Sequence, residues 1–209
     1  MITVNDVSMN FGSQVLFQEV NVTFNPGERY GLTGPNGAGK STFMKIVSGE
    51  LESMSGHVRR PKKTGILRQD HYGFESTRII DVVLMGNQPL WQAMSEKEVL
   101  LVKGDQLTDD DGIRLAELEM VIAEEDGYTA EGEATALLDG LGIDPQLHTE
   151  TLSTLTGGDK VRVLLVQALF GKPDALLLDE PTNSLDIVSI RWLEEFLMGY
   201  NGTLLVISH

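Results

Sequence analysis

The spacing of apolar residues along the first third of the chain is typical of β-strands. Apolar and polar residues alternate in ITVNDVSM and cluster in VLFQEVNVTF, and a turn-like segment at residues 10–13 separates the two runs. A period of two lets a strand bury one face, so this pattern predicts an antiparallel pair. Residues 29–33 form a further short predicted strand that leads into a glycine-rich loop, and a helix is expected over 40–47, ending near Gly49. Two more short strands are expected within residues 57–69.

From about residue 77 to residue 152 the spacing becomes helical. Apolar residues recur every three or four positions, first at Ile79, Ile80, Val83 and Leu84 and again at Leu115, Leu118, Val121 and Ile122. Such spacing predicts amphipathic helices. Proline and glycine interrupt the pattern, so several helices are expected rather than one. The interrupting residues are Pro89, Gly104, Gly127 and Pro145.

After this interval the pattern of buried strands returns. A helix is predicted over 159–170, and the apolar runs 175–178 and 203–207 are suited to parallel strands that are buried on both faces. The predicted fold class is therefore α/β, with an antiparallel β subdomain and an inserted helical lobe.

Composition excludes several classes of protein. A hydrophobic content of 41% in 209 residues is ordinary for a globular domain. The first residues lack a basic start followed by an apolar run, and no run approaches the roughly 18 apolar residues that span a membrane. We therefore expect a cytoplasmic protein with no direct membrane insertion. The absence of cysteine excludes disulfides and thiolate chemistry.

The net charge of −15 is concentrated in one region. Residues 91–150 hold 16 acidic residues against Lys97, Lys103 and Arg114, a net charge of −13. Binding to a phosphate backbone needs a basic surface, so the balance of charge argues against simple nucleic-acid binding. The simplest interpretation of the acidic run is a solvated helical face.

A complete phosphate-loop motif stands between the predicted third strand and the following helix. It consists of Gly34, Pro35, Asn36, Gly37, Ala38, Gly39, Lys40, Ser41 and Thr42, which match G-x-x-x-x-G-K-[ST]. The glycines allow backbone N–H groups to converge on phosphate oxygens, at a helix N-terminus that favours anions. Lys40 can reach the β- and γ-phosphates, and the Ser41 hydroxyl can bind Mg²⁺. The motif predicts a site for ATP with Mg²⁺.

Two carboxylates follow the apolar run at 175–178. Asp179 and Glu180 stand at the predicted carboxyl end of a buried strand, where open α/β sheets bind their ligands. Asp179 can hold Mg²⁺, and Glu180 can accept the proton of an attacking water. Strands often end in acidic turns, so the pair alone is weak evidence for a site. Together with the phosphate loop it becomes strong evidence.

The order of these motifs resembles the ATP-binding cassette (ABC) superfamily over nearly the whole chain. LTGGD at 155–159 is similar to the family signature, and LDEPTN with SLD at 178–186 is similar to its second carboxylate motif and D-loop. The resemblance implies a P-loop NTPase core of ABC type at 1–76 and 153–209, and a helical lobe at 77–152. It also implies roles for three isolated residues. Gln69 would contact Mg²⁺ and water, Phe11 would stack on adenine, and His209 would sense the γ-phosphate.

In that family a second cassette completes the site. The resemblance implies that Thr156, Gly157 and Gly158 of one cassette close over the nucleotide that another cassette holds. We therefore expect slow or absent ATP hydrolysis by one cassette alone, because phosphoryl transfer depends on positioning and charge stabilisation. Thr156 replaces the more common serine and keeps its hydroxyl.

Further segments resemble the ABC-F branch, which lacks membrane domains and acts on the ribosome. The acidic segment at about 91–126 is similar to that branch's arm insertion, and DGYTAE, LLDGLGI and PTNSLD are typical of it. Ser184 stands where histidine is more usual. The resemblance implies the first cassette of a longer protein, truncated at His209, whose ATP state gates binding to the ribosome.

Two alternatives remain open at this point. The chain could be the ATPase subunit of a membrane ABC transporter, which a shorter and less acidic insertion would favour. It could also be a clamp that binds ATP without hydrolysing it, although Lys40 and Glu180 are both present.

Overall fold

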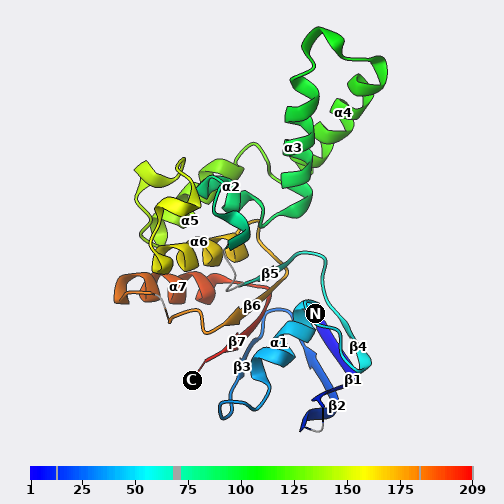
Figure 1. Ribbon diagram of the computed structural model, residues 1–209, viewed down its shortest axis with the longest axis vertical. Helices are drawn as coiled ribbons and strands as arrows, with labels where there is room; N and C mark the ends of the chain where they lie inside the picture. The colour runs from blue at the N-terminus through cyan, green and yellow to red at the C-terminus, as the bar shows by residue number, and fades with distance from the viewer. Residues whose placement is uncertain (13, 68–71, 184, 209) are drawn as a thin grey trace. The chain divides into compact units, whose positions relative to one another are not determined.

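The computed structural model describes residues 1–12, 14–67, 72–183 and 185–208. The chain forms two compact units, coloured along the sequence in Figure 1. The first, here the sheet unit, consists of Met1–Gln69 and Lys172–His209, and the second, the helical unit, of Asp70–Gly171. The helical unit extends further than the predicted lobe at 77–152, since it also includes the segment that follows residue 152.

An antiparallel sheet forms one part of the sheet unit. Its strand order is β2-β1-β4, with β1 at Ile2–Phe11, β2 at Gln14–Phe24 and β4 at Ser55–Arg59. The predicted antiparallel pair is confirmed, with Ile2 opposite Phe24 and Phe11 opposite Gln14. Irregularities in register bend the sheet, and β4 approaches β1 closely there. A β-carbon on Gly56 would lie 2.2 Å from the Asn5 carbonyl oxygen, so this position requires glycine.

A parallel sheet forms the other part of the sheet unit. Its order is β3-β7-β6-β5, with β3 at Arg29–Leu32, β5 at Thr64–Ile66, β6 at Ala175–Asp179 and β7 at Thr203–Ile207. The apolar residues of β6 are fully buried, as predicted, and each buried leucine contributes about 2 kcal/mol.

The described residues of the sheet unit form two α-helices. α1 spans Lys40–Ser48 and ends at Gly49, whose left-handed backbone caps it as expected. Phe43, Met44 and Val47 bury its apolar face in a core shared with both sheets. α7 spans Ile187–Gly199 and begins at Asp186, whose carboxylate accepts hydrogen bonds from two backbone N–H groups.

The helical unit contains five α-helices within its described residues. They are α2 at Ile79–Leu84, α3 at Gln88–Leu101, α4 at Asp109–Glu124, α5 at Ala130–Gly140 and α6 at Gly157–Leu169. Short 3₁₀ turns lie at Tyr72–Phe74, Gly104–Gln106, Pro145–Leu147 and Leu152–Thr154. The predicted apolar faces are buried at Ile79, Val83, Leu84, Leu118 and Ile122.

Helices α3 and α4 form a hairpin that we call the arm, residues 88–124. In Figure 1 the hairpin extends away from α2, α5 and α6 of the same unit. Local sequence explains both starts: Asn87 caps α3 with Pro89 in its first turn, and Thr108 and Asp111 form a reciprocal capping box on α4. Among the described residues, no helix is both long and apolar enough to span a membrane.

Candidate nucleotide-binding site

The phosphate loop joins β3 to α1 in the predicted strand, loop, helix order. Gly34, Gly37 and Gly39 adopt positive φ angles of 154°, 81° and 88°, which glycine accepts without strain. Gly39 also packs closely on the first sheet, because a β-carbon there would lie 3.3 Å from Cβ of Leu16. Residues with a β-carbon would therefore fit poorly at these glycine positions, because of the backbone conformation and, at Gly39, the close packing.

The start of α1 presents backbone donors. At the first turn of the helix, Phe43 N–H donates a hydrogen bond to the Gly39 carbonyl at 2.8 Å. In an α-helix the N–H groups of the preceding residues have no acceptor within the helix. Here those residues are Lys40, Ser41 and Thr42, and the glycine before them offers no side-chain cap. The helix end is therefore suited to an anion.

Lys40 folds back over the loop that precedes it. Its ammonium group donates hydrogen bonds to the carbonyl oxygens of Gly34, at 2.7 Å, and Pro35, at 3.2 Å. Both acceptors are neutral, so the positive charge of Lys40 meets no carboxylate in these bonds. A phosphate group could replace the carbonyls and would pair the ammonium with an opposite charge, which adds Coulomb attraction to the hydrogen bonds.

The predicted carboxylates lie at the same edge of the parallel sheet as the phosphate loop. Asp179 ends β6 and stands opposite Ile207 of β7, which in turn stands opposite Leu32 at the end of β3. Two strand spacings place the backbone of Asp179 about 10 Å from that of Leu32, two residues before Gly34. Ser41 and Asp179 offer the hard oxygen donors that suit Mg²⁺.

Mg²⁺ is usually held by one or two protein groups together with phosphates, rather than by a full set of carboxylates. Ser41 at the start of α1 and Asp179 at the end of β6 are two such groups. The residues present therefore fit a metal that arrives with a nucleotide.

Glu180 occupies an unusual backbone position directly after β6. Its φ angle is 48°, and its N–H donates to the Ile207 carbonyl at 3.0 Å. The side-chain amide of Asn183 donates a hydrogen bond to Oε2 of Glu180. In the sequence, Asn183 stands out only as part of the LDEPTN segment, which gave it no role of its own in the site. The signal that could have identified it is a carboxamide three residues after the proposed base, within one turn of chain.

Thr156, Gly157 and Gly158 lie together at the start of α6, in the helical unit. The Thr156 hydroxyl caps the helix by accepting from Asp159 N–H at 3.4 Å, and it donates to the Asp159 carboxylate at 2.8 Å. A β-carbon on either glycine would meet nothing within 4 Å, so the surface beside them is open. This arrangement leaves the two glycines accessible to a partner.

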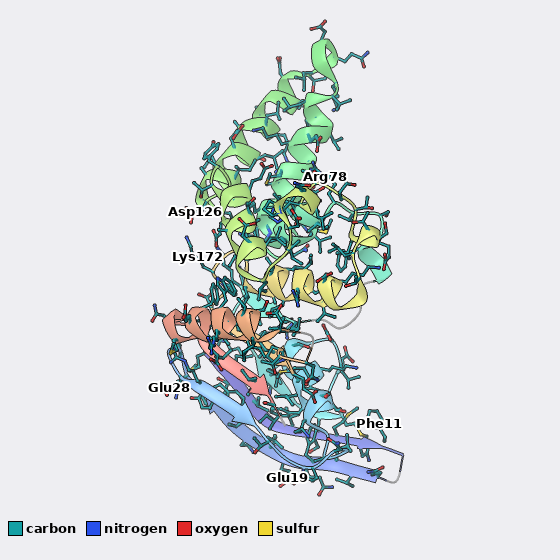
Figure 2. The ribbon with its side chains drawn as sticks, turned by 90° about the vertical axis from the view of Figure 1, so that its left-hand side faces the viewer. Phe11, Glu19, Glu28, Arg78, Asp126 and Lys172 are labelled. Carbon is teal, nitrogen blue, oxygen red and sulfur yellow. The ribbon has the colours of Figure 1, made fainter. Side chains whose placement is uncertain are left out.

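Phe11 has an exposed ring, unlike two other aromatic residues of the same unit, Phe17 and Tyr30. It is 57% exposed at the end of β1, where Figure 2 labels it. Phe17 packs edge-on against Phe43, and Tyr30 packs against Phe24. An adenine ring needs a free aromatic face, which favours Phe11 over the other two. Its role stays a prediction, and Gln69, Ser184 and His209 lie outside the described residues.

Comparisons with known proteins agree with this geometry. A family model described as "ABC transporter" matches residues 17–183. Across its whole length the chain is 51% identical to the "Uncharacterized ABC transporter ATP-binding protein YkpA" of Bacillus subtilis and covers 39% of that protein. It is 46% identical to the "Probable ATP-binding protein YbiT" of Escherichia coli O157:H7, covering 40%, and 34% identical to "ABC transporter F family member 4" of Arabidopsis thaliana, covering 29%.

Solved structures show the same fold at low sequence identity. One described as "Structure of ATP binding subunit of ABC transporter" matches all of this chain and 79% of its own, with a TM-score of 0.71 and 20% identity. The "Dimeric Structure of MJ0796, a Bacterial ABC Transporter Cassette" matches all of this chain and 88% of its own, with a TM-score of 0.65 and 19% identity. The chain spans about two fifths or less of the length of the curated relatives named above.

Proposed function

This chain is an ATP-binding cassette of the ABC transporter family, and from that premise we propose that it hydrolyses Mg-ATP in a site completed by a second cassette. The observation that carries the proposal is the shared sheet edge of the phosphate loop and the Asp179–Glu180 pair, with β7 alone between their strands. Nucleotides bind at this edge in open α/β sheets.

Each proposed site residue in the sheet unit then has a distinct role. The N–H groups at the start of α1 and the Lys40 ammonium bind phosphate oxygens. Ser41 and Asp179 hold Mg²⁺, which neutralises charge on the phosphates when it is bound. Glu180 orients the attacking water and accepts its proton, while Phe11 stacks on adenine. Gln69 and His209 are proposed to act beside the metal and the γ-phosphate.

The second cassette supplies the signature residues. Thr156, Gly157 and Gly158 surround an open helix start, which suits them to contact a nucleotide held by another cassette. A dimeric cassette structure with bound ADP and Pi has a TM-score of 0.66 to this chain. An isolated cassette is expected to turn over slowly because half of the donors are missing.

The resemblance to the ABC-F branch is confirmed by relatives that carry this name, including "ATP-binding cassette sub-family F member 3" of Pongo abelii, at 31% identity. We propose further that the ATP state of the protein gates its binding to the ribosome, in the cytoplasm. The arm between α2 and α5 supports this proposal, because the resemblance predicted an insertion there. The alternative is an ATPase subunit docked on a membrane transporter.

Co-sedimentation with ribosomes tests this choice. The full-length protein with Glu180→Gln is spun with purified ribosomes at physiological salt, with and without ATP, and Lys40→Ala serves as the control that cannot bind nucleotide. Pelleting that requires ATP supports the proposal that the protein binds the ribosome. If the ATP-bound protein stays in the supernatant, that proposal is rejected and a membrane partner is favoured.

A further inference from the structure

Large apolar side chains are exposed at the free end of the arm. The most exposed is Val102, at 83%, followed by Val99 at 67% and Ile113 at 63%. Leu101 and Leu107 are also exposed, and the whole stretch 101–110 lies in solvent. Side chains stand out from this end of the hairpin in Figure 2. Exposed apolar groups gathered in a short segment mark a surface for interaction.

The hairpin does not need these side chains for its own packing. Leu90, Ala93 and Leu100 of α3 and Leu118 and Ile122 of α4 are buried and hold the two helices together. Val99 and Val102 are three residues apart and so lie on one face of the helix end, next to the buried Leu100. The exposed set is therefore surplus to the fold of the arm.

Charge defines the kind of partner that fits. Residues 98–113 contain five carboxylates, Glu98, Asp105, Asp109, Asp110 and Asp111, against Lys103, a net charge of −4. Lys103 is engaged with Asp111 at 2.6 Å. Asp105, Asp109 and Asp110 are exposed in the same segment as the apolar side chains, so a partner of this segment would have to present positive charge to them.

The other two basic residues of the arm are also engaged within it. Arg114 forms ion pairs with Glu96 at 2.7 Å and with Glu117 at 2.8 Å, and Lys97 pairs with Glu119. RNA and anionic membranes are bound by cations or by stacked aromatic rings. Beyond Trp91, residues 92–127 contain no aromatic residue, so the end of the arm lacks both means.

We propose that the end of the arm, residues 99–113, docks on a basic protein surface that has an apolar recess. Val102 and Leu107 enter the recess, and Asp105, Asp109 and Asp110 face lysine or arginine around it. This inference does not depend on ATP hydrolysis, and it holds whether or not the partner protein belongs to a ribosome.

Photo-crosslinking at the arm end tests the proposal. A benzophenone amino acid replaces Val102 in the full-length protein, in the cell that makes it, and a second strain carries it at Met198 of α7, which is 69% exposed. Adducts are treated with RNase, which shortens an RNA adduct and leaves a protein adduct intact, and a surviving adduct is identified by mass spectrometry. The expected result is an adduct at position 102 alone, resistant to RNase, with one protein of net positive charge. That protein is then purified and titrated.

Matched variants separate the two parts of the contact. Leu107→Ser and the pair Asp109→Asn with Asp110→Asn are each expected to weaken binding to the purified partner about tenfold, because buried anchors and facing charges dominate such contacts. Met198→Ser and Glu52→Gln, both at exposed positions outside the arm, are expected to leave the affinity unchanged. Circular dichroism confirms that each variant keeps its helices.

Four outcomes would overturn the proposal. They are an adduct digested by RNase, an adduct with a second copy of this chain, equal adducts at positions 102 and 198, and an affinity that the arm variants leave unchanged. Failure of the ribosome proposal is detected separately, by the co-sedimentation of the Glu180→Gln protein.

Discussion

The sheet unit and the arm use charged side chains in opposite ways. In the sheet unit, the ammonium of Lys40 donates to the neutral carbonyl oxygens of Gly34 and Pro35. In the arm, Arg114 and Lys103 are paired with carboxylates of the same hairpin. Charges that rest on neutral groups remain able to bind an ionic ligand, whereas charges that neutralise each other hold a structure. Substitutions in the two regions should therefore change different observables.

The largest effect is expected from Lys40→Ala. The variant loses the cation of the phosphate loop, so Mg-ATP should bind at least about 100-fold more weakly, as measured by calorimetry. The thermal midpoint without nucleotide should change little, because only two exposed hydrogen bonds are lost. An affinity equal to that of the wild type would contradict the assignment of the site.

Glu180→Gln should separate binding from turnover. The amide keeps the shape of the carboxylate but cannot accept the proton, so phosphate release by the full-length protein should fall about 100-fold or more while ATP affinity is retained. Glu194→Gln, on α7, provides a control for the loss of one carboxylate. Normal phosphate release would show that the base lies elsewhere.

Asn183→Ala should have a smaller effect on the same reaction. Losing the amide that holds Oε2 of Glu180 is expected to lower kcat about tenfold and to leave KM nearly unchanged, because Asn183 acts through the base. Asn183→Ser, which keeps a donor, should recover part of the rate. A change in KM alone would indicate a contact with nucleotide instead.

The smallest effect is expected in the arm, at low pH. The Lys103 ammonium, with the backbone and hydroxyl of Thr108, lowers the pKa of Asp111 to about 2. Because the pKa is lower in the folded state than the ordinary value near 4, the ionised carboxylate stabilises the fold at pH values above about 4. This stabilisation is lost as the pH falls from about 4 toward 2 and the carboxylate is protonated. The first turn of α4 should therefore loosen over that range, which amide exchange would detect. Asp111→Asn should abolish this pH dependence, and ATP affinity at neutral pH should not change.

The sequence predicted local features better than long-range ones. The buried strand β6 and the helix α1 with its cap at Gly49 could be recognised because spacing and capping depend on neighbouring residues. By contrast, the pairing of Glu96 with Arg114 joins residues 18 positions apart across the hairpin, and a net charge count cannot reveal it. The acidic residues are mostly exposed, as a solvated face requires, but the pairing of some of them with Arg114 and Lys97 across the hairpin depends on the folded chain.

The candidate site likewise has features that the sequence could predict and features that it could not. The phosphate loop follows a fixed spacing that is visible in the sequence, and the structure places its residues around α1 as expected. The contact between Asn183 and Glu180 depends on the left-handed backbone of Glu180, which no pattern of residue types announces. The resemblance alone assigned adenine stacking to Phe11, and only the folded chain shows that its ring is exposed while Phe17 and Tyr30 pack against other rings.

The hydrogen bonds from Lys40 to the Gly34 and Pro35 carbonyls have a thermodynamic consequence. They hold the loop in its curved form before a ligand arrives, so the entropy of ordering this segment is lost during folding rather than during binding. Association then becomes an exchange of hydrogen-bond acceptors for the lysine. The heat capacity change measured on binding should accordingly be small, as for a preformed polar site, and not that of a coupled folding reaction.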